Sequence, residues 1–121
     1  MNKRMVDELI PQAYGVLAEK DIGIADEQGK IDSRWRGQIS SFGASVAQGS
    51  LLAAVSFFSA QGGAEVDRSK LMKAIAKLLN LDKPLFDYVK AADPLTAKEN
   101  VINAAIAIKL AMSLYDMGKG A

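Results

Sequence analysis

The longest stretch of the chain without a charged residue runs from Gly37 to Ala64. Within it, every fourth position is small, and helical geometry places such positions on one face, where another backbone can approach closely. A second face carries bulky residues. The small set is Gly37, Ser41, Ser45, Gly49 and Ala53, and the bulky set is Trp35, Ile39, Phe42 and Val46, continued by Leu51, Leu52, Val55 and Phe58. We therefore expect one helix, or two in tandem, covered on nearly all sides.

Two features of this uncharged stretch decide what kind of helix it forms. Gly49 can end one helix and Ser50 can cap the next, although a continuous helix through this point is the alternative. A membrane span would need about 20 mainly apolar residues. The serines, glutamines and glycines here would leave polar groups unsatisfied in lipid. The stretch is therefore expected to be buried within a water-soluble domain.

The first 33 residues predict a helix followed by a loop. The helix runs from about Lys3 to Lys20, and Pro11 should kink or divide it. The loop from Asp21 to Ser33 is polar, and Asp32 or Ser33 is expected to cap the central helix. The apolar residues expected to face inward are Met5, Leu9, Ala13, Val16 and Leu17 in the helix, and Ile22, Ile24 and Ile31 in the loop.

After a break at Gln61–Ala64, the clearest amphipathic helix runs from about Arg68 to Leu79, with Asp67 as its cap. Asn80 can end it in the left-handed conformation. A short helix over Pro84–Ala91 should follow. The amphipathic helix has an apolar stripe of Leu71, Ile75, Leu78 and Leu79, and Lys70, Lys73 and Lys77 lie about opposite it at 100° per residue.

The last predicted helix begins with a capping box at Thr96–Glu99 and continues to about Met117, ending at Gly118. Apolar residues occupy most of its circumference, and only Asn103, Lys109, Ser113 and Asp116 interrupt them. Ile102 and Ile106 fall on that polar side, so neighbouring helices or another protein must cover them. Because no strand-like alternation occurs, we expect an all-α fold, a compact single domain of about five to six helices over residues 1–121.

Composition argues against catalysis. The chain has 121 residues, 15 basic and 14 acidic side chains, no histidine and no cysteine. The usual general base, thiolate nucleophiles and zinc–thiolate sites are therefore missing. A serine–lysine arrangement using Lys109 lacks a nucleophile elbow, and Gly62–Gly63 lacks the residues of a phosphate-binding loop. We expect no enzyme, no metal and no cofactor, and a cytoplasmic protein, because the acidic Asp7–Glu8 pair does not suit a signal peptide.

Local basic groups are the remaining candidates for binding. Arg34 and Arg36 flank Trp35 at the start of the central helix. Trp35 could belong to the core, with the arginines solvated or paired with Asp32. Alternatively, the arginines could contact phosphates while the aromatic ring stacks on bases. The ridge of Lys70, Lys73 and Lys77, with Arg68 nearby, is either a solvated face or a salt-sensitive grip on nucleic acid.

The segment from Trp35 to Phe58 resembles the signature of the small helical subunit of the type III-B (Cmr) CRISPR RNA-guided effector complex. Members carry an aromatic and a basic residue, then Leu-Pro or Phe-Gly, a following aliphatic residue, a Gly-Leu pair and an Ala-rich helix that ends in aromatics. Trp35-Arg36, Phe42-Gly43, Val46 and Phe57-Phe58 match these elements. Gly49-Ser50-Leu51 departs from the Ser-Gly-Leu or Asn-Gly-Leu of the family.

The resemblance implies a non-catalytic scaffold in antiviral defence that contacts the backbone subunit, the large polymerase-like subunit, and guide and target RNA. We expect no membrane association and no small-molecule substrate, and self-association is left open. Candidate phosphate contacts are Arg34, Arg36, Arg68, Lys70, Lys73, Lys77 and Lys109, the last in a region expected to point inward, and candidate subunit contacts are Ile102 and Ile106. The alternatives are a helical protein–protein adaptor or regulator without nucleic-acid binding and, less favoured, a small DNA-binding regulator, for which no recognition helix is visible.

Overall fold

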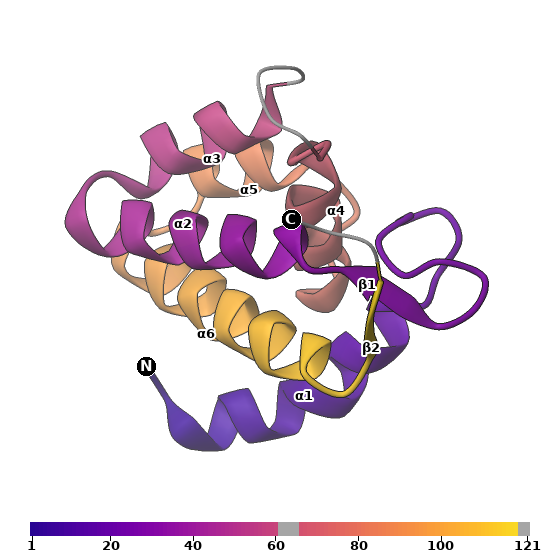
Figure 1. Ribbon diagram of the computed structural model, residues 1–121. Coiled ribbons are helices and arrows are strands. Elements are labelled where there is room, and N and C mark those ends of the chain that lie inside the picture. Colours follow the sequence, from indigo (N-terminus) through magenta and orange to yellow (C-terminus); the bar gives the residue numbers. More distant parts are fainter. Residues whose placement is uncertain (61–65, 119–121) are drawn as a thin grey trace.

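The computed structural model describes residues 1–60 and 66–118, which form six α-helices and a two-stranded sheet (Figure 1). The helices are α1 (Lys3–Leu17), α2 (Arg34–Gln48), α3 (Leu51–Ser59), α4 (Ser69–Leu78), α5 (Leu85–Ala91) and α6 (Pro94–Met112), and the strands are β1 (Lys30–Asp32) and β2 (Asp116–Gly118). The expected all-α fold class is confirmed. The predicted break at Gln61–Ala64 lies outside the described residues.

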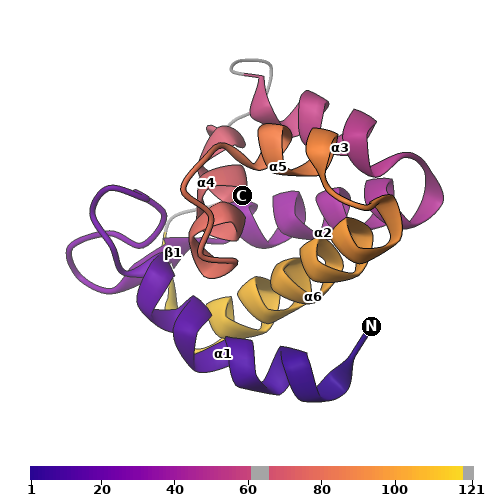
Figure 2. The same ribbon diagram turned by 180° about the vertical axis from the view of Figure 1, so that it is seen from behind.

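The longest helix, α6, lies at the centre of the bundle. It lies between α1 and α2, and α3 and α5 lie side by side beyond α2, on the side away from α1 (Figures 1 and 2). Nine of its 19 residues are buried, five of them alanines. Because the alanine side chain is small, neighbouring helices can come close to the backbone of α6 on several sides.

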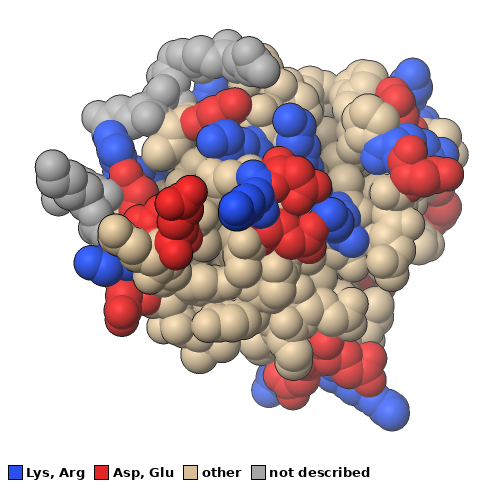
Figure 3. Space-filling view, turned by 90° about the vertical axis from the view of Figure 1, so that its right-hand side faces the viewer, with Lys and Arg blue, Asp and Glu red and all other residues tan. Residues whose placement is uncertain are grey.

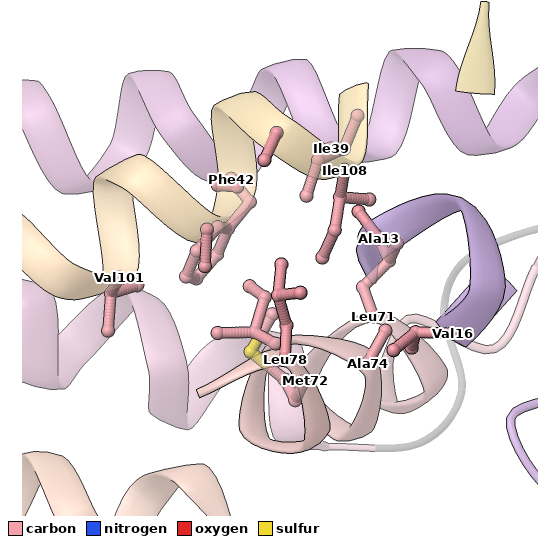
Figure 4. Close-up of a cluster of buried hydrophobic side chains, with 14 of the residues drawn as sticks. Ala13, Val16, Ile39, Phe42, Leu71, Met72, Ala74, Leu78, Val101 and Ile108 are labelled. Atoms are coloured by element: carbon pink, nitrogen blue, oxygen red, sulfur yellow. The ribbon is translucent and has the colours of Figure 1, made fainter. Parts of the chain in front are cut away.

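The core forms where α1, α2, α4 and α6 meet (Figure 4). Ala13, Ile39, Leu71 and Ile108 come from these four helices and are at most 2% exposed. The ring of Phe42 meets that of Phe58 from α3 edge to face, with centroids 5.2 Å apart. This contact fixes α3 against α2, because buried aromatic rings contribute both apolar area and a preferred geometry.

The small sheet was not predicted. β1 pairs with β2 in parallel, with Ile31 opposite Met117. Tyr115 stacks on Tyr14 of α1 at 4.5 Å between centroids, and its hydroxyl donates to the Tyr14 carbonyl at 2.5 Å. The chain turns after Met112 to make these contacts, so the expectation that the last helix continues to Met117 is wrong. Three-residue strands are too short for a period-2 pattern to reveal them.

Two further helix boundaries differ from expectation. α6 begins at Pro94, where the side chain of Asp93 accepts from the Thr96 amide at 3.0 Å, so the capping box at Thr96–Glu99 is not its start. Proline suits the first helical position because its missing N–H has no partner there anyway. α1 ends at Leu17 and is continuous through Pro11. Pro11 and Asp7 are both exposed, so water can bond the carbonyl that proline deprives of a donor.

Several local predictions are confirmed. Gly49–Ser50 divides the central segment, and Ser50 Oγ accepts from the Ala53 amide at 3.2 Å. Asn80 has a φ of 58°. Asp67 accepts from the Ser69 amide at 3.1 Å in the first turn of α4. At the start of α2, Asp32 rather than Ser33 accepts the capping hydrogen bond, from the Arg34 amide at 2.9 Å. The inward-facing residues Ile22, Ile24 and Ile31 are buried.

A neighbouring helix covers the polar side of α6 around Asn103, which is one of the two alternatives expected for Ile102 and Ile106, whereas Lys109 on the same side is exposed. Asn103 is fully buried, and its Oδ1 accepts from the Asn2 amide at 3.0 Å. The beginning of α1 covers this side, and Ile102 and Ile106 are half-buried against the core. Met5, expected to face inward, is 37% exposed, because it lies at the edge of this contact, where the Asn103 amide reaches its sulfur at 3.8 Å.

Candidate interaction surfaces

The small residues of α2 and α3 form an exposed, uncharged surface. Gly37, Ser41, Ser45, Gly49 and Ala53 are all exposed. The expectation that this segment is covered on nearly all sides is therefore wrong for the chain alone. Its bulky side packs on α6 and α5, and among the described residues no element covers the opposite side. We call the exposed, charge-free positions between Gly37 and Ala60 the uncharged face.

Large apolar side chains lie on and beside the uncharged face. Phe57 is 60% exposed and Leu52 is 42% exposed. Leu95, in the first turn of α6, is 80% exposed and shares with Leu52 a cavity of about 350 Å³ whose charged lining residues are Lys90 and Lys98. Exposed apolar groups gathered in one region indicate a contact surface. The sequence signal for Leu95 was the Asp93-Pro94 helix start, which places it on the outside of the first turn.

Arg68 is held against the aromatic end of α3. Its guanidinium lies 4.4 Å from the ring centroid of Phe57 and 5.4 Å from that of Phe58. Such cation–π contacts are worth about 0.5–1 kcal/mol at exposed sites. Arg68 therefore has a structural role at the junction of α3 and α4, independent of any phosphate contact.

The basic residues around Trp35 have separate roles. Trp35 is buried, which agrees with the alternative that it belongs to the core. Arg34 forms an ion pair with Asp32 at 2.5 Å between Nη2 and Oδ2. The hydrogen bond from Arg34 lowers the pKa of the Asp32 carboxyl. Arg36 is exposed, and it forms no ion pair with a described residue.

The lysine ridge is also divided. Lys77 Nζ bridges Glu19 and Asp21, at 3.3 Å from the latter, and its hydrogen bond with Glu19 is the main cause of its raised pKa. Lys70 Nζ donates to the carbonyl of Gly23 at 3.3 Å. Both lysines thus hold the loop after α1 onto α4. Lys73 is exposed and has no ion pair within the described part of the chain.

Lys109 is exposed in the last turn of α6 and does not point inward. Since α2 begins and α6 ends near the sheet, Arg36 and Lys109 lie toward the same end of the molecule (Figure 1). Figure 3 views the molecule from that end and shows basic side chains interspersed with acidic ones. Of the seven candidate phosphate contacts, Arg36, Lys73 and Lys109 are the exposed ones without an ion pair to a described residue.

Other kinds of site find little support over residues 1–60 and 66–118. No three acidic side chains gather there in a way that could hold a metal ion. None of the helices in these ranges combines the length and apolar character that crossing a bilayer requires. Comparison with known proteins found no match among protein-family models, curated proteins or solved structures.

Proposed function

We propose that this chain is a non-catalytic small subunit of a type III-B CRISPR RNA-targeting effector complex, docking on a neighbouring subunit through the uncharged face. The observation that carries the proposal is the exposure of that face: its small residues and Phe57 meet solvent, although no charged residue lies between Gly37 and Ala60. The segment that resembles the family signature, Trp35 to Phe58, is the one that forms this surface.

The physical argument concerns what such a surface is suited to. Charged residues make up 24% of the chain, yet none occurs along α2 and α3 beyond Arg36. Solvated helix faces normally carry charges. Small, uncharged side chains instead allow another helix to approach closely with little desolvation cost. A helical subunit of the same assembly is the partner that the resemblance implies.

Among the seven candidate phosphate contacts, we assign RNA binding to the three that are exposed and have no ion pair with a described residue. Arg36, Lys73 and Lys109 are exposed, whereas Arg34 and Lys77 pair with carboxylates, and Lys70 and Arg68 bind neighbouring groups of the fold. A basic side chain that is already paired with a carboxylate brings less net positive charge to the RNA and therefore releases fewer of its counterions. Contacts through these three groups would give weak, sequence-independent binding that falls as salt rises.

The docking step is tested by co-purification. The chain is co-expressed with the type III-B backbone and large subunits and guide RNA of its source organism, as wild type and as Ser45→Arg. We expect wild type to enter the complex and Ser45→Arg to bind at least tenfold more weakly, because an unpaired charge is costly in an interface. Gln28→Arg adds the same charge at an exposed loop position and should assemble normally.

Two results would count against this function. One is equal assembly of Ser45→Arg and Gln28→Arg, which would move the contact away from the uncharged face. The other is a source organism without type III-B effector genes, which would remove the partner altogether.

A second candidate function is a helical protein–protein adaptor without nucleic-acid binding. Its support is the pairing of basic with acidic side chains, at Arg4–Glu8, Arg34–Asp32, Lys77–Glu19 and Lys90–Asp87. Anisotropy of labelled single-stranded RNA distinguishes the two. The effector subunit should bind at low salt and lose affinity with Arg36→Glu, Lys73→Glu or Lys109→Glu but not with Lys3→Glu. No binding at low salt would favour the adaptor.

A further inference from the structure

A groove along α4 lies apart from the uncharged face. Its floor follows positions three and four apart on one side of α4 and just beyond it, namely Ser69, Met72, Lys73, Ala76, Lys77 and Asn80. Three other segments form its walls: Ser59 at the end of α3, Asp21 and Ile22 after α1, and Leu81–Leu85, which leads into α5 and includes its first residue. The cavity measures about 770 Å³.

We propose that this groove binds a small organic anion with an elongated apolar body, such as a chain carboxylate. Pockets for small molecules typically span about 300–1,000 Å³ and are mainly apolar with a few polar groups. From Ser69 to Asn80 the helical rise gives a length of roughly 16 Å. Walls from three separate segments close the groove at its sides, which suits a compact ligand better than a second helix.

The apolar part of the ligand would lie on a floor that is already formed. Ile22, Met72 and Leu85 are at most 4% exposed, and Ala76 is 9% exposed. Ala76 contributes only a methyl group to the floor, so its side chain fills little of the groove. The unbranched side chain of Met72 can adjust to the shape of an apolar chain.

The charges around the groove favour an acidic head group near Lys73. Five charged residues line it: Asp21, Lys73, Lys77, Asp82 and Lys83. Asp21 and Lys77 are paired with each other, and Glu19 also holds Lys77. Lys73 and Lys83 have no ion pair with a described residue, and Asp82 is the carboxylate of the lining that stays unpaired. Beside the groove, Asp67 is near enough for the charge of Lys73 to help lower its pKa, after the larger effect of the Ser69 hydrogen bond. Ser59 adds a hydroxyl group to the lining, whereas the Ser69 hydroxyl already donates to Asp67 at 2.6 Å.

The test titrates the full chain with three ten-carbon probes below their micelle-forming concentrations, following the amide signals of α4 by NMR. The probes are decanoate, decanol and decyltrimethylammonium. We expect decanoate to bind at least fivefold more tightly than decanol, and the cation most weakly. Ala76→Leu should weaken decanoate at least tenfold by filling the floor, whereas Ala44→Leu, at an exposed position of α2, should leave binding unchanged.

A second variant, Lys73→Glu, tests the contact between the carboxylate head group and Lys73. Lys73→Glu should weaken decanoate at least fivefold and leave decanol unchanged, whereas Lys109→Glu should affect neither. Equal affinity for the three probes, no binding of decanoate, or full binding by Ala76→Leu would overturn the proposal. Subunit assembly and RNA binding by Ala76→Leu should stay at wild-type levels, so failure here is distinguishable from failure of the proposed function.

Discussion

The two regions of the molecule with the fewest charges, α6 and the α2–α3 pair, occupy opposite environments. In α6, five alanines are buried together with Val101, Ile108 and Met112. In α2 and α3, Ala44, Ala47 and Ala53 are exposed, as are the serines and glycines between them. The composition is similar, but one helix is the centre of the core and the other pair forms an outer wall.

The difference lies in the number of sides on which helices pack. α6 is contacted by α1, α2, α4 and α5, whereas α2 is contacted by α6, α3 and β1 only on its bulky side. A missing charge therefore does not indicate burial within the chain. It indicates a surface on which charges are disfavoured. For α6 the reason is burial by other helices of the same chain. For the uncharged face, we propose that the reason is burial by a partner subunit.

The largest expected effect separates two adjacent rings of α3. Phe58 is 2% exposed and contacts Phe42, whereas Phe57 is 60% exposed. We expect Phe58→Ala to lower the free energy of unfolding by about 3–5 kcal/mol, because it removes buried area and leaves a cavity. Phe57→Ala should cost about 1 kcal/mol or less, from its contact with Arg68. Urea denaturation followed by circular dichroism measures both.

The same pair tests which surface carries docking. Phe57→Ala should weaken assembly with the proposed partner although it hardly changes stability. If Phe57→Ala destabilised the isolated chain as much as Phe58→Ala, the uncharged face would be part of the fold, and the contrast with α6 would disappear.

A smaller effect is expected from enlarging an alanine in each region. Ala107 in α6 is 0% exposed, whereas Ala44 in α2 is exposed. Ala107→Leu should cost about 1–3 kcal/mol by overpacking. Ala44→Leu should stay within about 0.5 kcal/mol, since exposed positions tolerate such changes. Thermal unfolding of the two variants against wild type is the measurement, and equal shifts in Tm would show that α2 is as enclosed as α6.

Most of the fold could be predicted from local signals. The break at Gly49–Ser50, the left-handed Asn80 and the stripe of Leu71, Ile75 and Leu78 depend on residues close in sequence, and the structure confirms them. The sheet and the buried Asn103 depend on distant partners: Asn2 is 101 residues from Asn103, and Ile31 of β1 pairs with Met117 of β2. A pattern along one helix carries no information about such partners.

The candidate sites were harder to predict for the same reason. Sequence placed Lys70, Lys73 and Lys77 on one ridge, but the acids that occupy Lys77, Glu19 and Asp21, come from another segment. Arg34, in contrast, has its partner two residues away, and pairing with Asp32 was one of the alternatives that the sequence left open. The exposure of Phe57 follows from where α3 ends in the bundle, which periodicity cannot show.

The smallest expected effect concerns the start of α2, where charges reappear beside the uncharged face. Arg34 lowers the pKa of Asp32 below the ordinary value of about 3.9, so this pair stabilises the fold above that pH, and the contribution is lost as pH falls through the lowered pKa. Arg34→Gln should raise the Asp32 pKa toward 3.9 and remove about 1 kcal/mol or less at neutral pH.

Carboxyl ¹³C NMR titration measures the Asp32 pKa, and Arg36→Gln is the control, since Arg36 does not pair with Asp32 within the described residues. An unchanged pKa in Arg34→Gln would assign the shift to the Arg34 backbone amide, which also donates to Asp32 at 2.9 Å. A raised pKa would instead show that the guanidinium is engaged with Asp32 within the chain, so the proposed contact surface begins after Arg34.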